Sequence, residues 1–171
     1  SIYAATKITN ELFANVNYKI NGIISIGLRF FTVYGPWGRP DMAPYHFIDS
    51  IFNNKTIKIF NNGEQYRDFT YIDDITNSIY KLYLKKNIFV SNEVINIGSG
   101  NPIYLKDFVE IIENITNKKF NKEWVEAQPG DVVKTYADIS KLKKIINFEP
   151  KTDIENGLRK TIEWYKKFKN I

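Results

Sequence analysis

The sequence predicts an α/β fold built around parallel strands. Segments with apolar residues at helical spacing alternate along the chain with short runs rich in β-branched residues, and this alternation is typical of α/β proteins. The length of 171 residues and the hydrophobic fraction of 43% are sufficient for a buried core. No repeat, low-complexity tract or flexible linker interrupts the pattern, so we expect the chain to pack as a single unit.

The chain opens with a predicted helix over residues 2–19. Ile8, Leu12 and Val16 recur four residues apart, so they would form one apolar stripe along this helix. The dipeptide Asn21-Gly22 follows, and it is typical of a point where a helix ends.

The next predicted element is a strand over Ile23–Phe31. Its run of apolar residues, rich in β-branched side chains, is typical of a strand that is buried on both faces of a parallel sheet. The segment Tyr34–Pro40 then combines turn formers with aromatic residues and cannot continue the strand. It would leave Arg39 at the carboxyl end of the strand, where open α/β sheets bind their ligands.

The rest of the chain continues the alternation. Asp73 or Asp74 is placed to cap the helix that follows them. The predicted helices cover residues 43–53, about 73–85, 105–115, 139–146 and 153–168, and the predicted strands cover Thr56–Phe60, Tyr66–Thr70, Glu93–Ile97 and an extended Lys122–Ala127, with a loop at Gln128–Asp131.

The net charge of +5 comes from one end of the chain. Residues 141–169 hold nine basic and four acidic residues, whereas residues 1–140 are neutral overall. An excess of charge along a terminal amphipathic helix is typical of a solvated face. We therefore expect no nucleic-acid partner, which would gather cations and aromatic residues into one patch.

Several other classes of protein are excluded by composition. The chain has no cysteine, which rules out disulfides and thiolate metal sites and fits a reducing, cytoplasmic setting. Uncharged runs such as Ile20–Leu28 are too short to cross a bilayer, so we expect no membrane association. His46 is the only histidine and is expected to be structural, and no metal site is expected.

Arginine is scarce, with four arginines against 20 lysines. Arg29, Arg39 and Arg67 all lie beside turn glycines or aromatic residues. A guanidinium group can hold a phosphate or carboxylate through two-point contacts that lysine cannot copy. Surface salt bridges are the alternative role for each of these arginines.

Tyr3 and Lys7 lie four residues apart on the first predicted helix, so both side chains project from one face. A lysine ammonium near a phenol favours the phenolate, and such a tyrosine can act as a general base toward a sugar hydroxyl. The spacing alone is weak support for catalysis, because tyrosine and lysine meet in this way by chance in many helices.

Further motifs accompany this pair along the chain. In sequence order they are Tyr3-Ala-Ala-Thr-Lys7, residues 27–42, Arg67-Asp-Phe-Thr-Tyr-Ile-Asp-Asp74, Asn96-Ile-Gly98 and Gln128-Pro-Gly-Asp-Val132. These motifs, in this order, are similar to those of the extended short-chain dehydrogenase/reductase family. Within this NAD-dependent epimerase/dehydratase group they most resemble those of nucleotide-sugar epimerases, in particular UDP-glucuronate 4-epimerases.

The resemblance implies a catalytic role for the first helix. Tyr3 would be the base, and Lys7 would assist it and bond the nicotinamide ribose of NAD. The sugar 4-hydroxyl would lose its proton to Tyr3 while hydride passes from C4 to NAD, and the 4-keto sugar would then turn over and take hydride back on its other face. The implied substrate is a UDP-sugar, and members of the family commonly pair as homodimers through the tyrosine helix.

The resemblance also implies four substrate contacts. Thr32 is similar to the residue that hydrogen-bonds the sugar carboxylate, Arg39 and Arg67 resemble arginines that hold the diphosphate side, and Asp131 resembles an acid that meets the uridine ribose. A purely structural role stays open for two of these residues: the Thr32 hydroxyl could be hydrogen-bonded within its strand, and Asp131 could form a turn.

The family's other half is expected to be missing from this chain. Residues 1–35 would be a remnant of the Rossmann domain, and 36–171 mainly the smaller substrate-binding α/β domain, with a strand near 93–98 returning to the sheet. A whole enzyme of this kind needs about 300 residues. The glycine-rich phosphate loop is lacking, since Gly98-Ser99-Gly100 has no third glycine. We therefore expect neither tight NAD binding nor turnover from this chain alone.

Other functions are also consistent with the sequence. Sugar-nucleotide 4,6-dehydratases and reductases share the Tyr-Lys pair. The chain could instead be a non-catalytic module that binds UDP-sugars through Arg39, Arg67 and Asp131. It could also be a structural fragment that mediates dimerisation.

Overall fold

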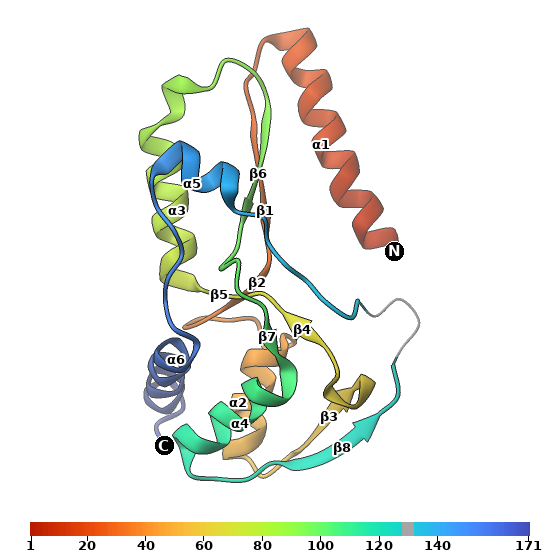
Figure 1. Cartoon of the computed structure of the whole chain (residues 1–171), viewed down its shortest axis with the longest axis vertical. Helices are drawn as coiled ribbons and strands as arrows, with labels where there is room; N and C mark the ends of the chain where they lie inside the picture. Colours follow the sequence, from red (N-terminus) through yellow and green to blue (C-terminus); the bar gives the residue numbers. More distant parts are fainter. Residues whose placement is uncertain (128–131) are drawn as a thin grey trace.

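The computed structural model describes residues 1–127 and 132–171. The predicted loop Gln128–Asp131 lies outside the described residues. In the upper part of Figure 1, strand β1 (Ile26–Phe30) pairs in parallel with β6 (Glu93–Ile97). Helix α1 (Ile2–Asn21) lies on one side of this pair, and α3 (Ile72–Leu84) and α5 (Ser140–Ile146) lie on the other.

The lower part of Figure 1 combines helices with one parallel and one antiparallel strand pair. In the register of the parallel pair Thr56 lies opposite Asn121, and in that of the antiparallel pair Tyr66 lies opposite Tyr104. The elements are α2 (Ala43–Phe52), α4 (Leu105–Thr116), α6 (Ile154–Lys169), the parallel pair β3 (Thr56–Phe60) and β8 (Asn121–Val125), and the antiparallel pair β4 (Tyr66–Arg67) and β7 (Ile103–Tyr104), with 3-10 turns η1 (Asn61–Gly63) and η2 (Lys86–Ile88) elsewhere in the chain.

The two parts meet where the chain changes strand partners. The Phe31 amide donates to Ile97 of β6 at 3.4 Å, and the next amide, of Thr32, donates to the Asp68 carbonyl at 3.0 Å. Strand β2 (Thr32–Tyr34) then pairs in parallel with β5 (Phe69–Tyr71). This switch places Thr32 at the carboxyl end of β1, on the border between the two parts.

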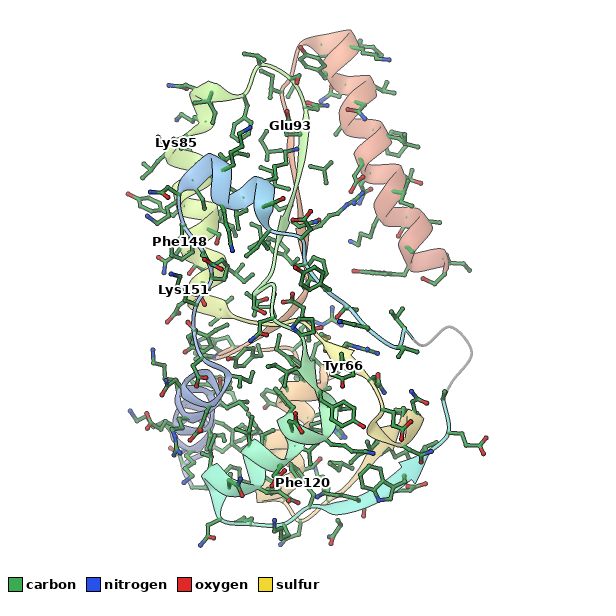
Figure 2. All side chains as sticks on the ribbon, viewed as in Figure 1. Tyr66, Lys85, Glu93, Phe120, Phe148 and Lys151 are labelled. Atoms are coloured by element: carbon green, nitrogen blue, oxygen red, sulfur yellow. The ribbon has the colours of Figure 1, made fainter. Side chains whose placement is uncertain are left out.

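The buried residues form two clusters. The lower core includes Ile57, Phe108 and Leu158, which are fully buried between the strands and α2, α4 and α6. The upper core includes Ile95 and Leu142, from β6 and α5. The elements that pack beside β1, β6 and α5, thus come from distant parts of the sequence. The predicted domain boundary near residue 35 stays a prediction. Figure 2 shows how widely the two parts extend, with Glu93 near one end and Phe120 near the other.

The predicted first helix is present as α1. The Ser1 side chain caps it by accepting a hydrogen bond from the Ala4 amide, and Gly22 ends it in a left-handed conformation with φ of 69°. The apolar stripe also forms, but none of the residues of α1 is buried. Leu12, for example, stays 58% exposed.

The strand predicted over Ile23–Phe31 is shorter and more open than expected. It begins at Ile26 as β1, and none of its residues is fully buried. Phe30 is 47% exposed. Burial on both faces was a wrong expectation because α1, the layer on one side of β1, buries none of its own residues and does not seal that face.

Two further expectations are wrong in detail. The single strand predicted over Tyr66–Thr70 is divided at Asp68 into β4 and β5, which pair with different strands. The helix predicted to follow Asp73 or Asp74 begins earlier, at Ile72, with Tyr71 at its N-cap position, so neither aspartate caps it. Instead, Asp74 accepts a hydrogen bond at 2.8 Å from the Thr152 amide, 78 residues further along the chain.

Candidate functional site

A central cleft of about 640 Å³ contains two of the predicted substrate residues, Thr32 and Arg67. Thr32 comes from the start of β2 and Arg67 from β4, so the cleft lies at the border between the two parts. Apolar side chains such as Phe47, Phe60 and Phe69 line it together with polar and charged ones, a combination that is common in ligand sites. The lining residues are Thr32, Asp41, Met42, Ala43, His46, Phe47, Thr56, Lys58, Phe60, Gln65, Arg67, Phe69 and Leu105.

The Arg67 guanidinium is held in place at the edge of this cleft. It donates to the Tyr66 carbonyl at 2.9 Å, to the Val133 carbonyl at 3.5 Å and to the side-chain oxygen of Gln65. Gln65 is itself buried, and its amide nitrogen donates to the Phe60 carbonyl at 2.9 Å. No sequence pattern marks Gln65, because its role depends on these two contacts.

Asp68 fixes the backbone between Thr32 and Arg67. Its side chain is fully buried, and five groups donate to its two carboxylate oxygens. The donors are the amides of Ser99, Gly100 and Ala137 at 2.8 to 3.0 Å, the Ser99 hydroxyl at 2.9 Å and the Thr70 hydroxyl at 3.2 Å. The Gly98-Ser99-Gly100 turn therefore donates hydrogen bonds to the Asp68 carboxylate.

Arg39 lies outside the central cleft. It lines a neighbouring cavity of about 250 Å³ with the Gly35–Gly38 turn. Its guanidinium makes a two-point ion pair with Asp41, at 3.0 and 2.5 Å, and this hydrogen bonding raises the pKa of Arg39 and lowers the pKa of Asp41. Both side chains are exposed, so the pair costs little to break and Arg39 is available to an anionic ligand.

The loop that carries Arg39 is anchored on the C-terminal helix. Trp37 has φ of 63°, an uncommon conformation for a bulky residue, and it is 76% exposed. Its ring lies 5.4 Å from the ring of Trp164 and 5.5 Å from that of Phe168, both on α6. These ring contacts help to hold the strained loop.

Tyr3 and Lys7 line a third cleft, the helix cleft, which lies between α1 and β1 and has a volume of about 550 Å³. As their spacing predicted, both side chains lie on one face of the helix, and the Lys7 amine lies 5.2 Å from the centre of the Tyr3 ring. Tyr3 is 71% exposed and does not line the central cleft with Thr32.

Three consecutive residues, at the end of β1 and the start of β2, each line one of the three cavities. Phe30 lines the helix cleft, Phe31 lines the Arg39 cavity and Thr32 lines the central cleft. The predicted residues thus gather around the carboxyl end of β1, apart from Asp131, which lies outside the described residues.

Lys58 and His46 are among the lining residues that were not proposed as ligand contacts from the sequence. Lys58 is on the exposed side of β3 and faces the central cleft, 4.0 Å from Glu123. His46, expected to be structural, is exposed and lines the same cleft. The alternation of exposed and buried residues in Thr56–Phe60 could have indicated Lys58, whereas nothing in the sequence marks His46. Among residues 1–127 and 132–171 there is no cluster that could hold a metal ion, and no helix there is long and apolar enough to span a membrane.

Parallel strands, a Tyr-x-x-x-Lys helix beside the first strand and ligand-sized clefts match the C-terminal portion of the extended short-chain dehydrogenase/reductase fold. A family model described as the NAD dependent epimerase/dehydratase family matches residues 1–98. The chain belongs to this family.

Known relatives extend well beyond this chain. A UDP-glucuronate 4-epimerase of Thermodesulfobacterium geofontis is 46% identical over 97% of this chain and 50% of its own length. The structure of a UDP-glucuronic acid 4-epimerase from Bacillus cereus with UDP-glucuronic acid and NAD has a TM-score of 0.92 at 35% identity, over 98% of this chain and 53% of that one. A dTDP-glucose 4,6-dehydratase from Bacillus anthracis with NAD has a TM-score of 0.87 at 26% identity, over 99% and 53%. The chain spans about half the length of the curated relatives it matches.

Proposed function

We propose that this chain is the sugar-nucleotide-binding half of an NAD-dependent UDP-glucuronate 4-epimerase. The observation that carries the proposal is the placement of Thr32 and Arg67 in one cleft, next to the cleft that holds Tyr3 and Lys7. The 46% identity to a UDP-glucuronate 4-epimerase supports the choice of substrate.

The central cleft would hold the nucleotide diphosphate and the sugar acid. Arg67 and Lys58 supply positive charge at its rim, and the orientation of the Arg67 fork by Gln65 suits two-point contacts to a diphosphate. The Thr32 hydroxyl would donate to the sugar carboxylate. Arg39 would leave Asp41 and close over the bound anion from the adjacent cavity.

In the helix cleft, Tyr3 would accept the proton of the sugar 4-hydroxyl and later return it. The Lys7 ammonium beside the ring would stabilise the phenolate and bind the nicotinamide ribose of NAD. NAD, when bound, supplies the acceptor and donor of hydride at C4. The residues of this chain fit only that end of NAD, because no Gly-x-Gly-x-x-Gly turn occurs in the sequence. We infer that the chain alone gives no turnover and that the complete protein acts as a homodimer.

Calorimetric titration of the chain with UDP and with uridine tests the proposed cleft. UDP should bind and uridine should bind far more weakly, because the diphosphate provides the anionic contacts. Arg67→Lys keeps the charge but loses the fork, and it should weaken UDP binding about tenfold. Arg159→Lys, at an exposed ion pair on α6, is the matched control and should leave binding unchanged. Equal affinities for UDP and uridine would contradict the proposal.

A 4,6-dehydratase is the second candidate, favoured by the structural match to such an enzyme. The two functions differ in whether the site recognises a sugar carboxylate. Thr32→Val removes the hydroxyl with little change in shape, so it should abolish a preference for UDP-glucuronate over UDP-glucose in competition titrations. A wild-type chain that shows no such preference would favour the dehydratase.

A further inference from the structure

The helix cleft contains an acidic residue beside the proposed catalytic pair. Tyr3, Lys7 and Glu11 follow one another at intervals of four residues, and all three side chains line this cleft. Glu11 is therefore one helical turn from Lys7, at the spacing at which a carboxylate and an ammonium form an ion pair. Such a pair would draw the Lys7 ammonium away from the Tyr3 ring.

In the structure Glu11 is engaged by a different partner. Arg29, the fourth residue of β1, donates from Nε to one carboxylate oxygen of Glu11 at 2.7 Å and from Nη2 to the other at 2.8 Å. Hydrogen bonding from Arg29 lowers the pKa of the Glu11 carboxyl, which keeps it charged and bound to the guanidinium. Within the described residues, Lys7 has no carboxylate within ion-pair distance, and its amine stays over the Tyr3 ring.

The geometry explains why Glu11 pairs with Arg29 and not with Lys7. Its fork satisfies both carboxylate oxygens at once, whereas Lys7 could offer one point of contact. The order Lys-then-Glu along a helix is also the weaker orientation for a pair four residues apart. Among the described residues, the charged side chains that line the helix cleft are Lys7, Glu11 and Arg29, so this cleft holds no second acid.

We propose that Arg29 is a positioning residue, which holds Glu11 across the helix cleft so that the Lys7 ammonium remains available to Tyr3. This inference rests on the proposed function of Tyr3 and Lys7. It assigns to the Arg29–Glu11 pair a role beyond fastening α1 to β1.

The titration of Lys7 in the free chain tests this role. Reductive methylation with ¹³C-formaldehyde gives each lysine an NMR signal, and Lys7→Arg identifies the signal of Lys7. In Arg29→Gln the released Glu11 carboxylate should pair with Lys7, and the Lys7 titration midpoint should rise by about 0.3 pH unit. Arg29→Lys keeps the charge without the fork and should give a smaller rise.

Glu11→Gln is the matched control, because it breaks the same contact without freeing an acid. Its Lys7 midpoint should not rise. Equal midpoints in the wild type and in folded arginine variants would overturn the inference, and so would an equal rise in Glu11→Gln, which would indicate a fastening role alone. Circular dichroism verifies that each variant is folded. The measurement uses no nucleotide or cofactor, so its outcome is separate from that of the UDP titration.

Discussion

Asp68 is the residue on which the geometry of the central cleft most depends. Both of its carboxylate oxygens accept hydrogen bonds, one from Ser99 and Thr70 and the other from the amides of Gly100 and Ala137. A buried carboxylate is stable only when its acceptor sites are filled in this way. The same residue offers its carbonyl to Thr32 and precedes β5, so it ties together both sides of the cleft.

Asp68→Asn should therefore destabilise the chain by about 3 kcal/mol or more, because the amide group would place N–H groups against the amides of Gly100 and Ala137. Urea denaturation at neutral pH measures the loss. Asp73→Asn, at an exposed position in the first turn of α3, is the control and should change stability by less than about 0.5 kcal/mol. Similar losses in the two variants would argue against this role of Asp68.

Individual residues also show where sequence reasoning ends. The spacing of Tyr3 and Lys7 sufficed to place both on one face of a helix, because that relation is local. The partners of Asp74 and Gln65 could not be predicted, since Thr152 and the Phe60 carbonyl are brought near only by the folded chain. Asp68 was expected in a strand, but its long-range hydrogen bonds divide that strand in two.

At the scale of elements, Glu113 fastens the end of α4 to the start of β8. It is 4% exposed, accepts from the Phe120 amide at 2.9 Å and pairs with Lys119 at 3.0 Å and Lys122 at 2.8 Å. Burial alone would raise the pKa of the Glu113 carboxyl, but these three hydrogen-bond partners outweigh burial and lower it. The connection between helix and strand is therefore stabilised by the charged form of Glu113.

A lowered pKa in the folded state means that Glu113 stabilises the fold above its unfolded pKa of about 4.3, and that this contribution is lost as the pH falls through the folded value. Glu113→Gln should cost about 2 kcal/mol at pH 7, and the difference from the wild type should shrink on acidification. Urea unfolding at several pH values measures this trend. Glu110→Gln, on the exposed face of α4, should show no such pH dependence. A difference that grows toward low pH would refute the assignment.

Most elements could be predicted from local patterns, and the errors concern burial and strand boundaries. The helices α2, α4 and α6 begin and end within a residue or two of the expected limits. The apolar run Ile23–Phe31 indicated a strand correctly but not its exposure, because burial depends on which layers cover the sheet. No local pattern specifies those layers.

At the scale of the whole molecule, α1 stands apart from both cores. It contains no buried residue, and its contacts with the rest of the chain include the Arg29–Glu11 pair, a hydrogen bond from Tyr18 to the Val90 carbonyl at 3.0 Å and one from Asn92 to Asn15 at 3.2 Å. Figure 1 shows it lying alongside the β1–β6 pair. The helix that carries Tyr3 and Lys7 is thus the least supported long element of the described structure.

Helices in proteins owe most of their stability to the packing of an apolar face, and α1 buries none of its residues. Opening of α1 should therefore be far more frequent than opening of α4, in which Phe108 and Ile112 are fully buried. In hydrogen exchange followed by mass spectrometry, amides of residues 2–21 should exchange at least about a hundredfold faster than those of residues 105–116, as expected for a difference of roughly 3 kcal/mol in opening free energy. Comparable protection of the two helices would show that α1 is held by forces other than these few polar contacts.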